Sequence, residues 1–82
     1  MHELAITKEI VELILEECKR RKIKSVKNIK IEIGNMTTYK KNPILHYFEI
    51  IKKENQVTKN ANLKVKEIKG EDLIIKSFEE NS

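Results

Sequence analysis

The chain has 82 residues, of which 39% are hydrophobic and 37% are charged, and its 17 basic and 13 acidic residues give a net charge of +4. This length allows one small domain, and the hydrophobic fraction suits a folded domain rather than a disordered tail. The single cysteine excludes an internal disulfide framework and a cysteine-rich zinc site within these residues. No apolar run is long enough to cross a membrane and no leader is recognisable, so the sequence predicts a cytoplasmic protein.

An amphipathic helix is predicted over residues 4–22, where apolar residues recur at three- and four-residue spacing. Cys18 lies on its apolar face and is predicted to be a buried, inert thiol rather than a nucleophile. Basic residues 19–22 fall in the last predicted turn, where cations complement the helix dipole. We interpret this cluster as a solvated helix end. Nucleic-acid binding through residues 19–24 is disfavoured, because no aromatic residue lies among them to stack on bases.

The next two elements are a strand and a second helix. Residues 26–33 are predicted to form a strand with one buried face, because isoleucine alternates with polar residues over 28–33, and Gly34 ends it. Asn42 and Pro43 indicate a helix N-cap followed by proline at the first helical position. The predicted second helix runs to about Glu54.

The last third of the chain reads as a hairpin, with strands over residues 63–66 and 73–78 and turn residues at 69–72. The returning strand has apolar residues on both faces, so we expect it to be central in the sheet or to face a partner. The second helix is long enough to act as a crossover, so the first two strands are predicted to be parallel and the third antiparallel to one of them.

The predicted fold class is therefore α+β, an α/β two-layer arrangement with two helices packed on one face of a small three-stranded mixed sheet. The element order is α-β-α-β-β, in a single domain over residues 1–82. The order of the strands within the sheet is left open. With no glycine-rich phosphate loop and little volume for an enclosed pocket, the sequence does not predict an enzyme.

The N-terminus carries a set of potential metal ligands. The Met1 amine, the His2 amide and imidazole, and the Glu3 amide or carboxylate can close adjacent chelate rings, and such nitrogen donors favour square-planar Ni(II) or Cu(II). Judged on the residues alone, a solvated terminal histidine is the more common interpretation. His46 falls off the apolar stripe of the second helix, and it is a candidate for one further nitrogen ligand if that helix packs near the N-terminus.

Several segments taken together resemble the hydrogenase nickel-incorporation protein family, the HypA-type nickel metallochaperones. The resemblance begins with the opening Met-His-Glu-Leu-Ala-Ile and covers nearly the whole chain in order. It is carried by residues 1–6, 29–34, 45–51, 60–65 and 70–79.

This resemblance implies a nickel-binding accessory protein that is not an enzyme. In the family nickel is held by an N-terminal Met-His-Glu, which corresponds here to Met1, His2 and Glu3, through the imidazole and main-chain nitrogens. The implied partners are a GTPase and the precursor of a hydrogenase or urease. The resemblance makes the metal site our first interpretation.

The family normally carries a zinc module with two Cys-x-x-Cys pairs between its last two strands. Here residues 67–72 bridge that gap and no cysteine remains there, so we expect Ni(II) but no zinc. Both a naturally shorter homologue and one from which the module was removed fit this pattern. The alternative function is a protein–protein interaction module that retains the scaffold, including a homodimer through the two-sided strand over residues 73–78.

Overall fold

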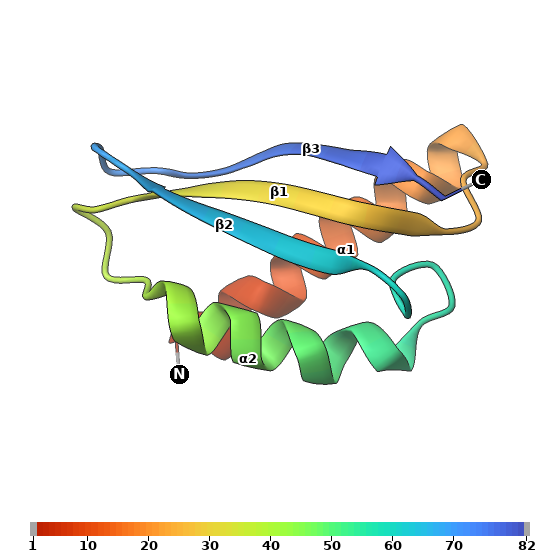
Figure 1. The fold of residues 1–82 in the computed structure, drawn as a ribbon, viewed down its shortest axis with the longest axis horizontal. Coiled ribbons are helices and arrows are strands. Elements are labelled where there is room, and N and C mark those ends of the chain that lie inside the picture. Colours follow the sequence, from red (N-terminus) through yellow and green to blue (C-terminus); the bar gives the residue numbers. More distant parts are fainter. Residues whose placement is uncertain (1, 82) are drawn as a thin grey trace.

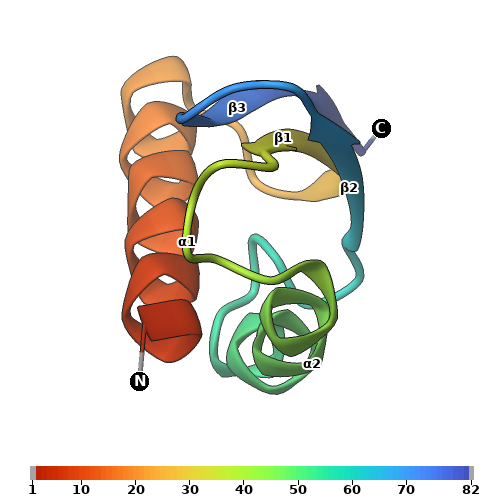
Figure 2. The same cartoon turned by 90° about the vertical axis from the view of Figure 1, so that its left-hand side faces the viewer.

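A computed structural model describes the backbone of residues 2–81 and the side chains of residues 3–81. The elements in chain order are α1 (His2–Arg21), β1 (Val26–Gly34), α2 (Lys41–Ile51), a short 3-10 helix η1 (Lys52–Glu54), β2 (Asn62–Ile68) and β3 (Leu73–Glu80). Both helices lie on the same side of the three-stranded sheet (Figures 1 and 2). The predicted two-layer α+β class and the α-β-α-β-β order are confirmed.

The sheet has the order β2-β1-β3. Strand β1 is parallel to β2, with Asn28 opposite Asn62, and antiparallel to β3, with Ile33 opposite Leu73. The parallel pairing follows from the crossover through α2, because a short turn cannot join parallel neighbours. The predicted parallel and antiparallel relations are therefore confirmed.

The hairpin prediction is wrong, because β1 lies between β2 and β3. Residues 69–72 cross over the end of β1 instead of folding β3 back onto β2. Backbone hydrogen bonds hold this crossing segment to the end of β1. The Gly34 amide donates to the Asp72 carbonyl at 2.8 Å, and the Met36 amide donates to the Gly70 carbonyl at 2.8 Å. Of the two alternatives expected for β3, the central position is wrong. Strand β3 is an edge strand, and its second apolar face leaves Ile74 43% exposed.

The N-cap prediction for the second helix is wrong by two residues. The helix begins at Lys41, and its N-cap is Lys40, which has an extended backbone and no capping hydrogen bond from its side chain. Pro43 is therefore the third helical residue. It is tolerated there because the first four amides of a helix have no intrahelical acceptor.

The core lies between the sheet and the helices. Strand β1 faces it with isoleucines that are almost completely buried, and each helix contributes one apolar stripe. The main contributors are Ile29, Ile31 and Ile33 from β1, Ile10, Ile14 and Cys18 from α1, and Ile44 and Phe48 from α2. Because β1 is covered by both helices and paired on both edges, it is the natural centre of the domain.

Glycine is required at position 34, because the backbone of residues 70–71 passes very close to it. A Cβ atom at this position would lie 2.3 Å from the Gly70 carbonyl oxygen and 2.9 Å from the Glu71 amide nitrogen. Both atoms belong to the backbone, so no side-chain movement could relieve the contact. The close approach therefore demands glycine at the end of β1.

We expect Gly34→Ala to lower the free energy of unfolding by about 1–3 kcal/mol, because overpacking forces the backbone of residues 70–71 away from β1. Urea unfolding followed by circular dichroism measures this change. Lys69→Ala, an exposed substitution in the same crossing, is the control and should change stability by less than about 0.5 kcal/mol. Equal stability of Gly34→Ala and the unchanged protein would contradict the close crossing.

Candidate metal centre

The start of α1 lies beside the start of α2. The Glu3 carboxylate accepts a hydrogen bond from the Lys40 backbone amide at 3.1 Å, and Lys40 directly precedes α2. The Glu3 carbonyl accepts a hydrogen bond from the hydroxyl of Thr7, which is fully buried. Glu3 thus fixes the first turn of α1 both to its own next turn and to the neighbouring helix.

The predicted nickel ligands fall partly outside the described part of the chain. Met1 lies outside it, and of His2 only the backbone is described, as the first residue of α1. The amides in the first turn of an α-helix have no intrahelical acceptor. The main-chain nitrogens at the start of α1 are consequently not used by the helix itself. The positive end of the helix dipole also favours any negative charge that develops there.

His46 lies on α2 and is exposed, as its position off the apolar stripe predicts. Its ring makes an edge contact with the neighbouring Tyr47 ring, with the centroids 5.4 Å apart. Among the described side chains, no three of the histidine, cysteine, aspartate and glutamate residues gather closely enough to hold a metal ion. A metal centre at Glu3 therefore needs main-chain donors or groups from the first two residues.

Cys18 is buried in the core, as predicted, with 1% of its surface exposed. Burial raises the pKa of the Cys18 thiol, and the nearby positive charge of Arg21 only partly opposes this effect. A raised pKa keeps the sulfur in its neutral, weakly nucleophilic form at neutral pH. Cys18 is a structural residue rather than a ligand or nucleophile.

We expect Cys18 to react with iodoacetamide at pH 8 at least about 100-fold more slowly in the folded protein than in guanidinium chloride. Burial hides the sulfur, and the raised pKa reduces its thiolate fraction until the pH is well above 8. Mass spectrometry over time measures both rates. Similar rates in the two conditions would show that the sulfur is accessible.

In the basic end of α1, Arg20 and Arg21 have side-chain contacts. The Glu17 carboxylate pairs with Arg20, and it lies 3.9 Å from an Arg21 guanidinium nitrogen. The Arg21 guanidinium also lies 5.7 Å from the centre of the Phe78 ring. These contacts fit the interpretation of this cluster as a solvated helix end.

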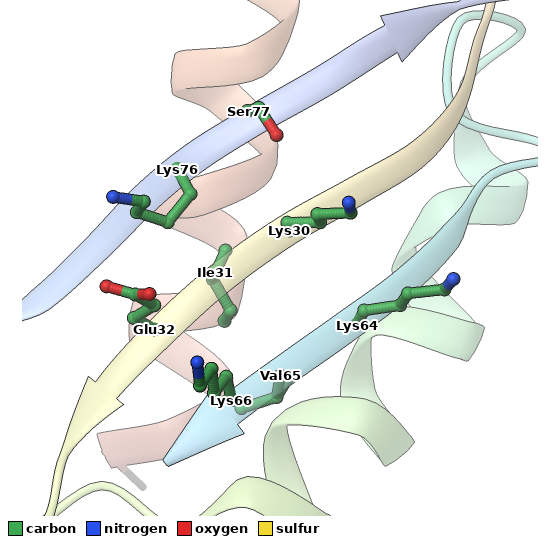
Figure 3. Close-up of a pocket in the computed structure, with 8 residues that line it drawn as sticks. All are labelled: Lys30, Ile31, Glu32, Lys64, Val65, Lys66, Lys76 and Ser77. Carbon is green, nitrogen blue, oxygen red and sulfur yellow. The ribbon is translucent and has the colours of Figure 1, made fainter. Parts of the chain in front are cut away.

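A second charged surface was not predicted. The sheet face opposite the helices carries a shallow hollow of about 390 Å³, and four of its eight lining residues are lysines, which come from all three strands (Figure 3). The alternation of lysine with apolar residues in the sequence places these side chains on one face of each strand. Only the strand order brings them together, and that order is not readable from the sequence.

In the described part of the chain, no helix has the length and apolar character needed to cross a membrane.

Comparison with known proteins gives one consistent family. A sequence model described as "Hydrogenase/urease nickel incorporation, metallochaperone, hypA" matches residues 1–78. The "Hydrogenase maturation factor HypA" of Caldanaerobacter subterraneus subsp. tengcongensis is 34% identical over 71 residues, which are 87% of this chain and 61% of that protein. The protein of the same name from Legionella pneumophila is 37% identical over 71 residues, covering 87% of this chain and 62% of its own length. The chain thus spans about three fifths of the length of these relatives.

Two solved structures share the fold. The solution structure of the Ni metallochaperone HypA from Helicobacter pylori has a TM-score of 0.77 at 18% identity, covering 92% of this chain and 70% of that one. A second structure, titled "Solution structure of HypA protein", has a TM-score of 0.81 at 17% identity. It covers 99% of this chain and 97% of that one. At these identities the likeness concerns the arrangement of helices and strands alone.

Proposed function

Because the chain belongs to the HypA family of hydrogenase/urease nickel-incorporation proteins, we propose that it is a nickel metallochaperone for the maturation of a nickel enzyme. The observation that carries this proposal is the match of the family over residues 1–78, which includes the N-terminal Met-His-Glu. In this role the protein binds Ni(II) as cargo and surrenders it, and it carries out no catalysis of its own. Its partners are those of hydrogenase maturation, with a GTPase and a hydrogenase or urease precursor as the expected members.

The proposed nickel ligands are the His2 imidazole and main-chain nitrogens of Met1, His2 and Glu3. Two features of the described structure support them. The chain enters α1 at His2, so the amides there have no intrahelical acceptor. The Glu3 carboxylate is already bonded to the Lys40 amide, which favours the Glu3 amide over its carboxylate as a nickel donor.

Such a site can release its cargo. Amide and imidazole donors must lose protons to bind a metal, so the affinity for nickel rises with pH and falls as the solution becomes acidic. A site at a chain end also leaves one side of the ion open to a competing ligand from a partner. No zinc is proposed for these residues, because Cys18 is their only cysteine and is buried.

A second candidate function is a protein–protein interaction module that keeps the scaffold without delivering metal. The observation that favours it is the outer side of β3, where Ile74 is 43% exposed and Leu13 of α1, beside the same groove, is 49% exposed. Light scattering with and without Ni(II) distinguishes the two functions. A dimer that forms without metal supports the interaction module, whereas assembly only with metal supports the metallochaperone.

We expect His2→Ala to weaken Ni(II) binding by at least about 100-fold, since even the loss of a group that only orients a ligand costs 10- to 100-fold. Isothermal calorimetry on protein with a free, untagged N-terminal amine measures the affinity. His46→Ala is the matched control and should leave the affinity unchanged, because His46 is exposed on α2. If His46→Ala rather than His2→Ala removes binding, the proposed site is wrong.

Glu3→Gln distinguishes the two donors that Glu3 offers. The amide oxygen of glutamine can still accept the Lys40 hydrogen bond, and the main-chain nitrogen is unaltered. We therefore expect the affinity for Ni(II), measured by the same calorimetry, to stay within about threefold of the unchanged protein. A loss of tenfold or more would identify the carboxylate as a ligand.

A further inference from the structure

Among the described residues, no helix or loop covers the face of the sheet that points away from the helices (Figures 1 and 2). Its hollow of about 390 Å³ is lined by the four lysines Lys30, Lys64, Lys66 and Lys76, together with Glu32 and Ser77. The remaining acid at the end of this face, Glu79, accepts a hydrogen bond from the Asn28 side chain at 2.9 Å. The uncovered face is thus predominantly basic.

The register of the sheet places two of these lysines directly opposite each other. Lys30 on β1 is the partner of Lys64 on β2, and Figure 3 shows the two side chains extending in the same direction from neighbouring strands. Neighbouring strands lie about 4.8 Å apart, and like charges directly opposite each other destabilise a sheet. The opposed lysines therefore do not stabilise the fold, which favours a role for them in binding.

None of the four lysines forms an ion pair with any other residue that the structure describes. Glu32 is placed opposite Lys66 by the register, but the two side chains make no ion pair. The ammonium groups are therefore available to an external anion. Their aliphatic stems add apolar surface between the charges.

We propose that this uncovered face is a docking surface for an acidic segment of a partner protein. Opposed Lys30 and Lys64 would receive a pair of carboxylates, and the aliphatic stems of the lysines would contact an apolar side chain of the same segment. A protein segment fits better than a nucleic-acid backbone for two reasons. Glu32 lies among the lysines, so a continuous string of phosphates would meet its negative charge, whereas a peptide can present a neutral or basic side chain there. The lining also contains no aromatic residue on which bases could stack.

The test uses an acetylated, amidated peptide of six glutamates interrupted by one lysine and one leucine. Hexathymidylate, which has the same net charge, serves as the phosphate comparator. Both are titrated into nitrogen-15-labelled protein at about 20 mM and about 150 mM salt, because exposed charge pairs weaken as salt rises. We expect the peptide to shift amide signals of residues 28–32, 62–66 and 74–79, and to bind more tightly than hexathymidylate at both salt concentrations.

The variant Lys30→Gln/Lys64→Gln should weaken peptide binding by about tenfold. The same substitution should raise the melting temperature by about 1–5 °C, because it removes the opposed charges. A residue with a merely structural role would not give this combination. The matched control is Lys53→Gln/Lys59→Gln, which removes the same charge from two exposed lysines outside the sheet and should change the affinity less than twofold.

Three results would overturn the proposal. The peptide shifts could centre on residues 19–24, the two double variants could weaken binding equally, or hexathymidylate could bind more tightly than the peptide. The last result would identify a nucleic-acid surface instead. None of these outcomes depends on nickel, so this test and that of the metal site can fail separately.

Discussion

The contact between Gly34 and Gly70 is the constraint on which the rest of the structure depends. It lets a four-residue link pass over the end of β1, and it therefore places β1 between β2 and β3. Once β1 is central, its isoleucines face both helices and become the middle of the core. Backbone hydrogen bonds and Gly34 close the sheet within the chain itself.

The fold separates two surfaces. The start of α1, where Glu3 is tied to the entry of α2, belongs to the helical layer. The lysine-lined hollow lies on the face of the sheet opposite the helices (Figure 3), so a partner docked there would not cover the start of α1. A metallochaperone benefits from this division, because it can be held by one surface while its cargo remains accessible at another. The basic face would then supply orientation and rate of encounter, and the metal site would supply the exchange itself.

Much of the fold is readable from the sequence because its signals are local. The three- and four-residue spacing of apolar residues predicts α1, and the alternation around Ile29 and Ile31 predicts β1. The errors of prediction arise where one local sequence pattern is compatible with two different structures. Pro43 fits the third position of a helix as well as the first. The turn residues around Gly70 serve a crossing as well as a hairpin.

Local sequence patterns predict the candidate sites less well than they predict the fold. No periodicity or spacing distinguishes His2 from a solvated terminal histidine, and only the resemblance to a family makes it a candidate ligand. The lysine-lined face can be recognised only when the pairing of the strands is known. Lys30 and Lys64 are 34 positions apart in the sequence, and the strand register alone reveals that they are neighbours.

The central claim, that nickel is bound by nitrogen donors at the start of α1, is tested most directly by the nuclear magnetic resonance spectrum with one equivalent of Ni(II). Square-planar Ni(II) with nitrogen donors is diamagnetic, whereas octahedral Ni(II) with oxygen donors is paramagnetic and broadens nearby signals. We expect the amide-proton signals of His2 and Glu3 to disappear, because these nitrogens lose their protons to bind nickel, while the signals of Leu4 and of residues around Lys40, which Glu3 contacts, shift and stay sharp. Broadening centred on His46, or an unaltered spectrum, would contradict the central claim.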